Sequence, residues 1–279
     1  MHQLKTHLQT GGGVVVSGDQ ITISNITPGD KATLTINVQN NSTVAVKYRT
    51  ILICDDADGL FAGLNVKIDG VEYDGNSRVS NYATLAAGAD IHSVVVEIEL
   101  PADAANTYQG KELNISYSVE AVQGNADVSA QDNATHVFNM ADLKTALTCR
   151  YQGQDLGVIS IEQDIDMTGW TAAGLNYCSF VLLGNGHSLT NQTAPLAGSL
   201  GIGAYKISNV KFVDADIDTD TLPGGALVGE IQCNGGMDLT IANCEVIDST
   251  IHAYKYAGGL IGFSSEANGI NVSLITITN

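Results

Sequence analysis

Four aspartates stand at alternate positions in the second half of the chain, a spacing that suits chemistry: Asp214, Asp216, Asp218 and Asp220. Alternate residues of a β-strand share one face, so these carboxylates could pair as general acid and base or bind a cation. The Ca²⁺-loop pattern also needs glycine at its sixth position and glutamate at its twelfth. Counted from Asp214, these positions hold Thr219 and Gly225, so the pattern fails. The sequence predicts a solvated strand edge with a weak cation site as the alternative, and it assigns no catalytic or cofactor-binding residue.

Other catalytic arrangements are missing from the sequence. The six histidines are singletons, and none belongs to the His-Glu-x-x-His pattern of zinc peptidases. There is no glycine-rich phosphate loop and no Gly-x-Ser-x-Gly nucleophile elbow. A polysaccharide lyase needs a strong base and a cation that neutralises the uronate, yet Arg150 is the one arginine of the second half. The sequence therefore predicts a protein that is not an enzyme and that needs no cofactor.

The charge of the chain narrows the choice of partners. With 12 basic and 30 acidic residues the net charge is −18, which repels phosphate backbones and anionic lipid heads. We expect no nucleic-acid partner and, since no apolar run approaches about 20 residues, no membrane span.

Met1 to Thr10 lacks an apolar signal region, so an export signal would lie outside this chain. The five cysteines are widely spaced and are interpreted as small apolar core residues.

Residues 11–130 alternate between apolar and polar side chains with a period of two. In one segment Ala32, Leu34 and Ile36 share a face, and polar residues occupy the positions between them. A second segment around Leu113 and Ile115 follows the same pattern. Half-buried strands at this spacing, without an amphipathic helix between them, predict an antiparallel β-sandwich.

This half resembles the TasA/camelysin family over about residues 20–125. The resemblance rests on motifs in matching order: Ile26-Thr27-Pro28-Gly29-Asp30, Val38-Gln39-Asn40-Asn41-Ser42, Tyr108-Gln109-Gly110 and Glu120-Ala121-Val122-Gln123. It implies a jelly-roll-like sandwich, export from a Gram-positive cell and self-assembly into matrix fibres by strand exchange. Camelysin members are described as metallo-endopeptidases, so the resemblance also raises that activity. Each motif has a physical reading too, because Pro-Gly and Asn-Asn set turns.

The second half repeats itself with an offset of 34 residues. Residues 206–217 match residues 240–251, so that Ile207 aligns with Ile241 and Asn209 with Asn243. A glycine-rich element follows each copy. Fixed-period similarity with short β-branched runs predicts a solenoid over residues 136–279, with Asn209 and Asn243 stacked at its corners. Upstream, Asn139 is predicted to cap a short helix over one end of the core.

This half resembles the right-handed β-helix proteins of the pectate-lyase-like superfamily, and its glycine elements are similar to GLUG repeats of bacterial surface proteins. The repeat that begins at Val272 stops at Asn279, so we expect a truncated solenoid.

Together these patterns predict an all-β chain: an antiparallel jelly-roll or Ig-like β-sandwich (11–130) followed by a truncated right-handed parallel β-helix (136–279) with a short capping helix. The predicted function is that of a secreted, adhesin-like protein of the cell surface or biofilm matrix. The sandwich would serve assembly into fibres, and the β-helix would be a stalk or a surface for glycans or proteins. The alternatives are a carbohydrate-active β-helix enzyme, either a polysaccharide lyase or a hydrolase, and a camelysin-like metallo-endopeptidase.

Overall fold

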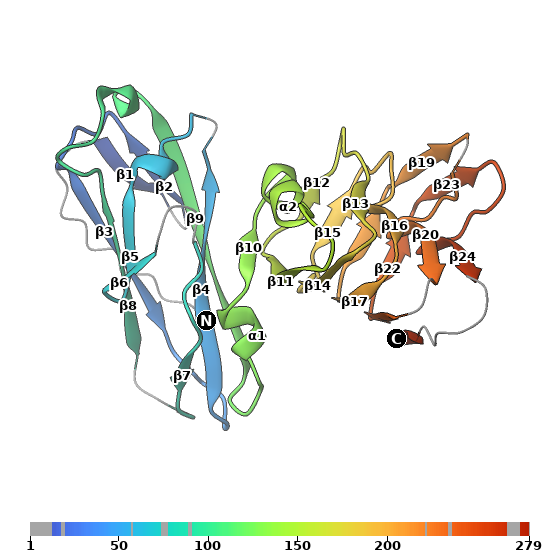
Figure 1. Ribbon diagram of the computed structural model, residues 1–279. Helices are drawn as coiled ribbons and strands as arrows, with labels where there is room; N and C mark the ends of the chain where they lie inside the picture. The colour runs from blue at the N-terminus through green and yellow to red at the C-terminus, as the bar shows by residue number, and fades with distance from the viewer. Residues whose placement is uncertain are drawn as a thin grey trace. The chain divides into compact units, whose positions relative to one another are not determined.

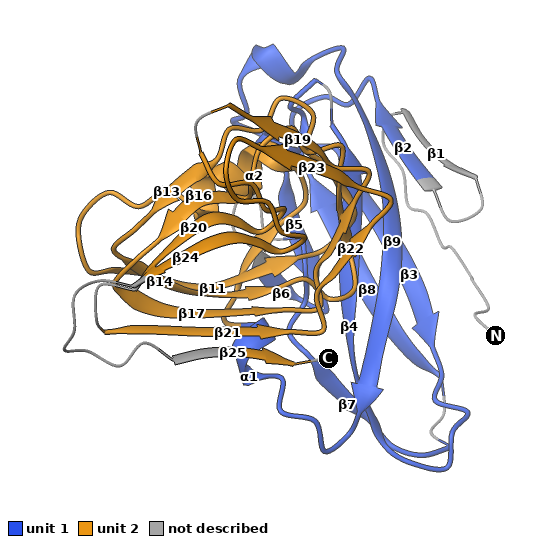
Figure 2. Cartoon of the chain, turned by 90° about the vertical axis from the view of Figure 1, so that its right-hand side faces the viewer, with its two compact units in different colours: residues 1–132 blue, residues 133–279 orange. Residues whose placement is uncertain are grey.

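The computed structural model of the chain describes residues 13–17, 20–56, 58–73, 78–88, 91–220, 222–233, 236–266 and 274–278. The chain divides into two compact units, residues 1–132 and 133–279, which Figure 2 distinguishes by colour. The segment Met1 to Thr10 lies outside the described residues, as does part of the repeat expected from Val272 to Asn279. Each unit is described by itself below.

Unit 1 contains two antiparallel sheets (Figure 1). The first has the order β1 (Gly13–Ser17), β2 (Gln20–Ser24), β9 (Glu112–Gln123), β4 (Val46–Asp55) and β7 (Ala83–Leu85). The second has the order β3 (Lys31–Val38), β8 (His92–Glu99), β5 (Asn65–Ile68) and β6 (Val71–Tyr73). The short helices are η1 (Phe61–Gly63), η2 (Asn106–Tyr108) and α1 (Ser129–Asp132).

The alternation of apolar and polar residues in the sequence matches the alternation of buried and exposed side chains in these strands. In β3, Leu34 and Ile36 are buried while the residues between them are partly exposed. In β9, Leu113 and Ile115 are buried and join the same apolar cluster as the β3 side chains. The two sheets therefore share one core, and the alternation predicted from the sequence is confirmed for these strands.

The turn motifs of unit 1 serve the backbone. Gly29 has a φ of 96° and Gly110 a φ of 75°, a region that glycine enters without steric cost. Asn40 is buried, and its side-chain amide donates to the carbonyl oxygens of Val44, Leu85 and Ala86 at 2.8–3.2 Å. The motif residues thus hold turns in place, as the physical reading of the sequence predicted.

Unit 2 contains parallel sheets only, among the strands that the structure describes. The long sheet has the order β10 (Thr135–Val137), β11 (Gln154–Ile161), β14 (Cys178–Leu183), β17 (Gly203–Ser208), β21 (Met237–Ala242) and β25 (Leu274–Thr278). One four-stranded sheet has the order β12 (Ile165–Asp166), β15 (Ser188–Thr190), β18 (Lys211–Val213) and β22 (Glu245–Ile247). The other has the order β13 (Ala173–Leu175), β16 (Ala197–Leu200), β20 (Val228–Cys233) and β24 (Ile261–Glu266). A two-stranded sheet pairs β19 (Asp216–Thr219) with β23 (Thr250–Ala253).

Each coil of unit 2, meaning a stretch that gives one strand to the long sheet and one to each four-stranded sheet in turn, lies beside the next coil (Figure 2). Ile207 pairs with Ile241, and Ile217 pairs with Ile251. The 34-residue offset seen in the sequence is therefore the register between neighbouring coils, as predicted.

Asparagines hold one corner of the coils. Asn185, Asn209 and Asn243 adopt positive φ between 52° and 56°, a left-handed conformation that asparagine tolerates better than most residues. The Asn243 amide donates to Asn209 Oδ1 at 3.2 Å, and the Asn185 amide donates to the Ile161 carbonyl at 2.9 Å. This stacking confirms the predicted corner ladder.

The start of unit 2 carries a short helix and a disulfide. Asn139 accepts a hydrogen bond from the Asp142 backbone at 2.9 Å and caps α2 (Met140–Ala146), whose Leu143 is buried in the core cluster of this unit. Cys149 and Cys178 form a disulfide with a Cα–Cα distance of 6.3 Å. The interpretation of all five cysteines as unbonded core residues is therefore wrong, although Cys54 and Cys244 are free.

The predicted fold class, an antiparallel jelly-roll or Ig-like β-sandwich followed by a truncated right-handed parallel β-helix, is contradicted by the structure. The chain is strand-rich with few helices, and several separate parallel sheets form a helix-like arrangement. The reason for the error is physical. Alternation fixes which side of a strand is buried, but it does not specify the strand's neighbours or the direction of pairing. In the described parts of the chain, no helix has both the length and the apolar character to cross a membrane.

Candidate functional site

The aspartate row, meaning Asp214, Asp216, Asp218 and Asp220, extends from one corner of unit 2 along the strand that follows it. Asp214 occupies the corner before β19 with a φ of 52°, Asp216 and Asp218 belong to β19, and Asp220 follows the strand. All four are exposed, whereas Ile217 between them is completely buried. The row therefore faces solvent along the edge of one coil.

The structure places a histidine beside this row. β23 runs parallel to β19 in a register that sets His252 opposite Asp218, and the two are joined by a 2.8 Å hydrogen bond between Nδ1 and Oδ1. This hydrogen bond is the main cause that raises the pKa of His252 above its ordinary value, and the charges of Asp218 and Asp220 add to it. A carboxylate and a proton-binding imidazole thus share one exposed face.

Sequence reasoning treated His252 as a singleton. A signal was present, because His252 stands 34 residues after Asp218, which is the offset of the repeat. Residues separated by that offset lie side by side in adjacent coils.

Other histidines of the described chain each contact one carboxylate. The nearest N–O distances are 3.4 Å for His92 with Asp69, 2.6 Å for His136 with Glu162, and 3.5 Å for His187 with Asp164. Across the described ranges, no three histidine, cysteine, aspartate or glutamate side chains gather as a metal ion would need. The cation site suggested for the aspartate row therefore stays a prediction without a ligand set.

Aromatic side chains follow the paired histidine along the chain. Tyr254 is 71% exposed, and the Lys255 ammonium lies 5.9 Å from the centroid of the Tyr254 ring. Tyr256 stacks on Phe263 with ring centroids 4.2 Å apart and planes 15° from parallel. Polar and aromatic groups therefore lie close together in the sequence at this edge of unit 2.

A groove crosses the outer face of the long sheet. Its volume is about 260 Å³, and its lining comes from four consecutive strands: Asp155, Ser179, Phe180, Val181, Ala204, Tyr205, Lys206, Asp238 and Thr240. Strand pairing sets Asp155 beside Ser179 and Ala204 beside Asp238, while Lys206 lies between Val181 and Thr240. The groove thus presents carboxylates, hydroxyls and one ammonium group across several coils. The sequence analysis did not predict this groove, because its lining is spread over four strands that are far apart in the sequence.

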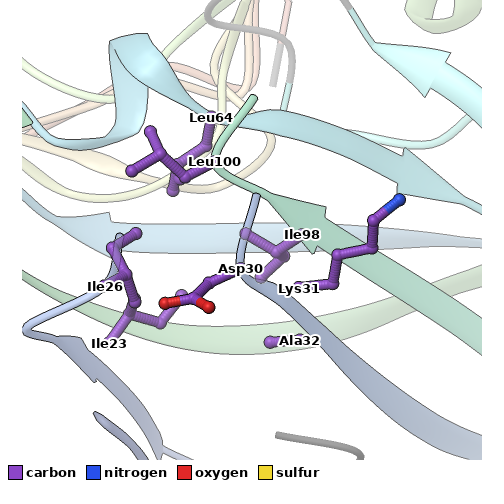
Figure 3. A pocket seen from close by; sticks show the side chains of 8 residues that line it. All are labelled: Ile23, Ile26, Asp30, Lys31, Ala32, Leu64, Ile98 and Leu100. Atoms are coloured by element: carbon purple, nitrogen blue, oxygen red, sulfur yellow. The ribbon is translucent and has the colours of Figure 1, made fainter. Parts of the chain in front are cut away.

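Two other hollows lie in unit 1 and suit a ligand less well. One of about 160 Å³ lies on the charged face of β3, β8 and β5, where Lys31 and Glu99 form a 3.0 Å ion pair. Figure 3 shows the other, an apolar pocket between residues such as Ile23, Ile98 and Leu100, with Asp30 at its side. Its volume of about 10 Å³ has room for little more than one water molecule.

Comparisons with known proteins return no family model and no curated protein that matches this chain. Similar solved structures include the Agl-KA catalytic domain, at 13% identity and a TM-score of 0.24, over 99% of this chain and 66% of that one. Another is the catalytic domain of a GH87 alpha-1,3-glucanase in complex with tetrasaccharides, at 12% identity and a TM-score of 0.20, over 98% of this chain and 62% of that one. A third is a Podospora anserina GH26-CBM35 beta-(1,4)-mannanase, at 12% identity and a TM-score of 0.16, over 66% of this chain and 49% of that one.

The prediction that the chain is not an enzyme finds no support among these neighbours, since two are named as catalytic domains and the third as a mannanase. The chain spans less than two thirds of the length of the second and third. At TM-scores of 0.24 and below, the likeness itself carries no argument for an activity of this chain. The functional proposal therefore rests on the side chains of unit 2.

Proposed function

We propose that the chain is a carbohydrate-active protein and that the groove on the long sheet binds a segment of polysaccharide. The observation that carries this proposal is the lining of the groove, in which polar groups from four successive coils face one continuous hollow of about 260 Å³. Neighbouring strands lie about 4.8 Å apart, so the groove from β11 to β21 extends over roughly 14 Å. That length suits a short run of sugar rings lying across the strands.

The lining suits sugar hydroxyls. Asp155 and Asp238 offer acceptors, Lys206 offers donors, and Ser179 and Thr240 offer both. Val181 and Ala204 add apolar surface between these groups. A hollow with mixed polar and apolar walls is the usual form of a small-molecule site. The two carboxylates flank a single ammonium, which favours a neutral glycan over a polyuronate.

Binding is supported more directly than cleavage. Glycoside hydrolysis uses two carboxyl groups about 5–9.5 Å apart, whereas Asp155 and Asp238 are three strands apart, roughly 14 Å. Asp216 and Asp218, two residues apart on β19, stand roughly 6.6 Å from each other along the strand, within that range. If the chain cleaves glycans, these two carboxylates are the candidates.

We also propose an extracellular location. The Cys149–Cys178 disulfide supports it, because structural disulfides persist in oxidising compartments. A surface or matrix role, and the assembly implied by the TasA/camelysin resemblance of residues 20–125, remain compatible with a glycan-binding unit.

The test is affinity electrophoresis through gels containing solubilised α-1,3-glucan, β-1,4-mannan or polygalacturonate, with an assay for released reducing ends in parallel. Ala204→Trp places a large ring in the middle of the groove at an exposed position. Ala141→Trp makes the same change at an exposed position of α2 and is the matched control. We expect a neutral glucan or mannan to retard the wild type and the control but not Ala204→Trp. Equal retardation of all three proteins, or of none, would overturn the proposal.

A further inference from the structure

The first strand of the groove is irregular at the residue that lines the hollow. The register of β11 with β14 shifts between Asp155 and Val158, where β11 has one residue more than its partner. Gly157, within this stretch, has a φ of 73°. The extra residue makes a β-bulge, a feature that is rare between parallel strands and that re-aims side chains next to functional sites.

The bulge decides which way Asp155 points. Asp155 is exposed, whereas Ile159, four residues later, is completely buried in the core cluster of unit 2. Residues an even number apart share one face of a regular strand, so without the bulge Asp155 would face the core together with Ile159. The extra residue reverses the alternation, and Asp155 therefore belongs to the outer face that lines the groove.

The bulge also holds the Asp155 carboxylate in one orientation. The Gly157 backbone N–H donates to Asp155 Oδ1 at 2.9 Å. Among the described residues no other group binds this carboxylate, so Oδ2 can accept a hydrogen bond from a ligand. A Cβ atom at position 157 would meet no other atom within 4 Å, so this position favours glycine for its left-handed backbone and not for want of space.

The residue opposite Asp155 is oriented as well. Ser179 pairs with Asp155 in the register of the two strands, and Ser179 Oγ accepts a hydrogen bond from the Ala204 backbone N–H at 3.0 Å. The hydroxyl of Ser179 keeps its proton to donate. An acceptor and a donor thus stand on neighbouring strands at one end of the groove, each already fixed by a backbone N–H.

We propose that Asp155 is the residue that selects neutral sugars in the groove, and that Gly157 is a positioning residue that acts through it. This inference rests on the proposed function of the groove. A sugar hydroxyl donates to Asp155 Oδ2 and accepts from Ser179 Oγ, whereas a ligand carboxylate has no proton to donate and is repelled by Asp155. Because the bulge fixes the carboxylate before binding, little side-chain freedom is lost when the sugar binds.

The test measures dissociation constants by affinity electrophoresis in gels with graded concentrations of β-1,4-mannan or α-1,3-glucan. Asp155→Asn keeps an acceptor for the Gly157 N–H but turns an amide NH₂ towards the ligand, and it is expected to bind about tenfold more weakly. Gly157→Ala is expected to bind about fivefold more weakly, because the left-handed conformation is unfavourable for alanine. Gly157→Asn should restore binding to within about twofold of the wild type, since asparagine tolerates that conformation. Polygalacturonate should retard Asp155→Asn more than it retards the wild type.

The chain offers matched controls for both changes. Gly169→Ala introduces the same strain at a φ of 83°, also with no atom within 4 Å of the new Cβ, and should bind as the wild type does. Asp248→Asn makes the same change of charge at an exposed position outside the groove and should also bind unchanged. In the double variant of Asp155→Asn with Gly157→Ala, the loss should not exceed that of Asp155→Asn alone, because Gly157 acts through the carboxylate.

Undiminished mannan or glucan binding by Asp155→Asn or by Gly157→Ala would overturn this inference, as would additive losses in the double variant. So would equal losses in Gly157→Ala and Gly169→Ala, or polygalacturonate retardation that is the same for Asp155→Asn and the wild type. In each of these cases the groove proposal stands if Ala204→Trp is not retarded while the wild type is. Retardation of no protein would overturn both. Equal unfolding temperatures of Gly157→Ala and Gly169→Ala establish that a difference in binding is not a difference in folding.

Discussion

The corner residue Asn185 allows a test of how the coils of unit 2 are held together. Its side-chain amide donates at 2.9 Å both to Ser160 Oγ and to the Ile161 carbonyl of the preceding coil, and its φ is 53°. Ser160 is completely buried, so these acceptors have little access to water. Asn185→Ala removes both hydrogen bonds. It also leaves alanine in the left-handed conformation without the side-chain hydrogen bonds that hold asparagine there.

The expected loss in the free energy of unfolding is the sum of these contributions. Each lost hydrogen bond costs about 1 kcal/mol. The left-handed conformation costs alanine about 1 kcal/mol more. Asn185→Ala is therefore expected to lower the free energy of unfolding by roughly 3 kcal/mol, which corresponds to a fall in Tm of about 5–10 °C.

Asn185→Gly separates the two effects, because glycine adopts positive φ without strain. It is expected to cost about 1 kcal/mol less than the alanine variant, since only the hydrogen bonds are lost. Thermal and urea unfolding of both variants, followed by circular dichroism, measures the difference. A glycine variant as destabilised as the alanine variant would refute the conformational part of the argument, and a neutral alanine variant would refute both parts.

Three further predictions concern ionisable and covalent contacts. Glu162→Ala removes the buried acceptor that lies 2.6 Å from His136 Nδ1 and should lower the free energy of unfolding by about 2 kcal/mol, measured in urea. The pKa of His252 should lie above its ordinary value in an NMR titration and fall towards it in Asp218→Asn. Because the folded-state pKa is the higher one, the pair stabilises the fold fully below the unfolded-state pKa, and the effect is lost as pH rises through the folded-state pKa. Cys178→Ser should lower stability by about 3 kcal/mol, because the disulfide closes a loop with a sequence separation of 29 residues.

Each of these predictions has its own contrary result. A Glu162→Ala variant as stable as the wild type would mean that the contact with His136 contributes nothing. A His252 titration that is the same in wild type and Asp218→Asn would exclude the hydrogen bond as the cause of the shift. For Cys178→Ser, the control is Cys54→Ser, whose thiol is free; equal losses of stability would remove the disulfide as the explanation.

Local features of the fold were predictable from the sequence. The burial of Leu34 and Ile36 follows from alternation, because the pleat of a strand sends successive side chains to opposite sides. The pairing of Ile207 with Ile241 follows from the offset of 34, because neighbouring coils stack in register. The N-cap at Asn139 follows from the preference of asparagine for that position.

Features that depend on several coils were not predictable. The order of strands in each sheet is set by the whole core, which alternation does not encode. The earlier coils have lengths other than 34 residues, so no repeat in the sequence shows that Cys149 lies beside Cys178. The groove arises because Asp155, Lys206 and Asp238 come from three strands whose pairing brings them together. The Asp218–His252 contact was accessible in principle, since the repeat offset joins the two residues.

The most direct test of the central claim, that the groove binds glycans, is hydrogen exchange by mass spectrometry with and without a mixture of α-1,3-gluco- and β-1,4-manno-oligosaccharides. The account predicts slower exchange in peptides that cover β14, β17 and β21, and unchanged exchange in peptides that cover β3 and β8. Protection confined to β3 and β8, or no protection in any peptide, would contradict the claim.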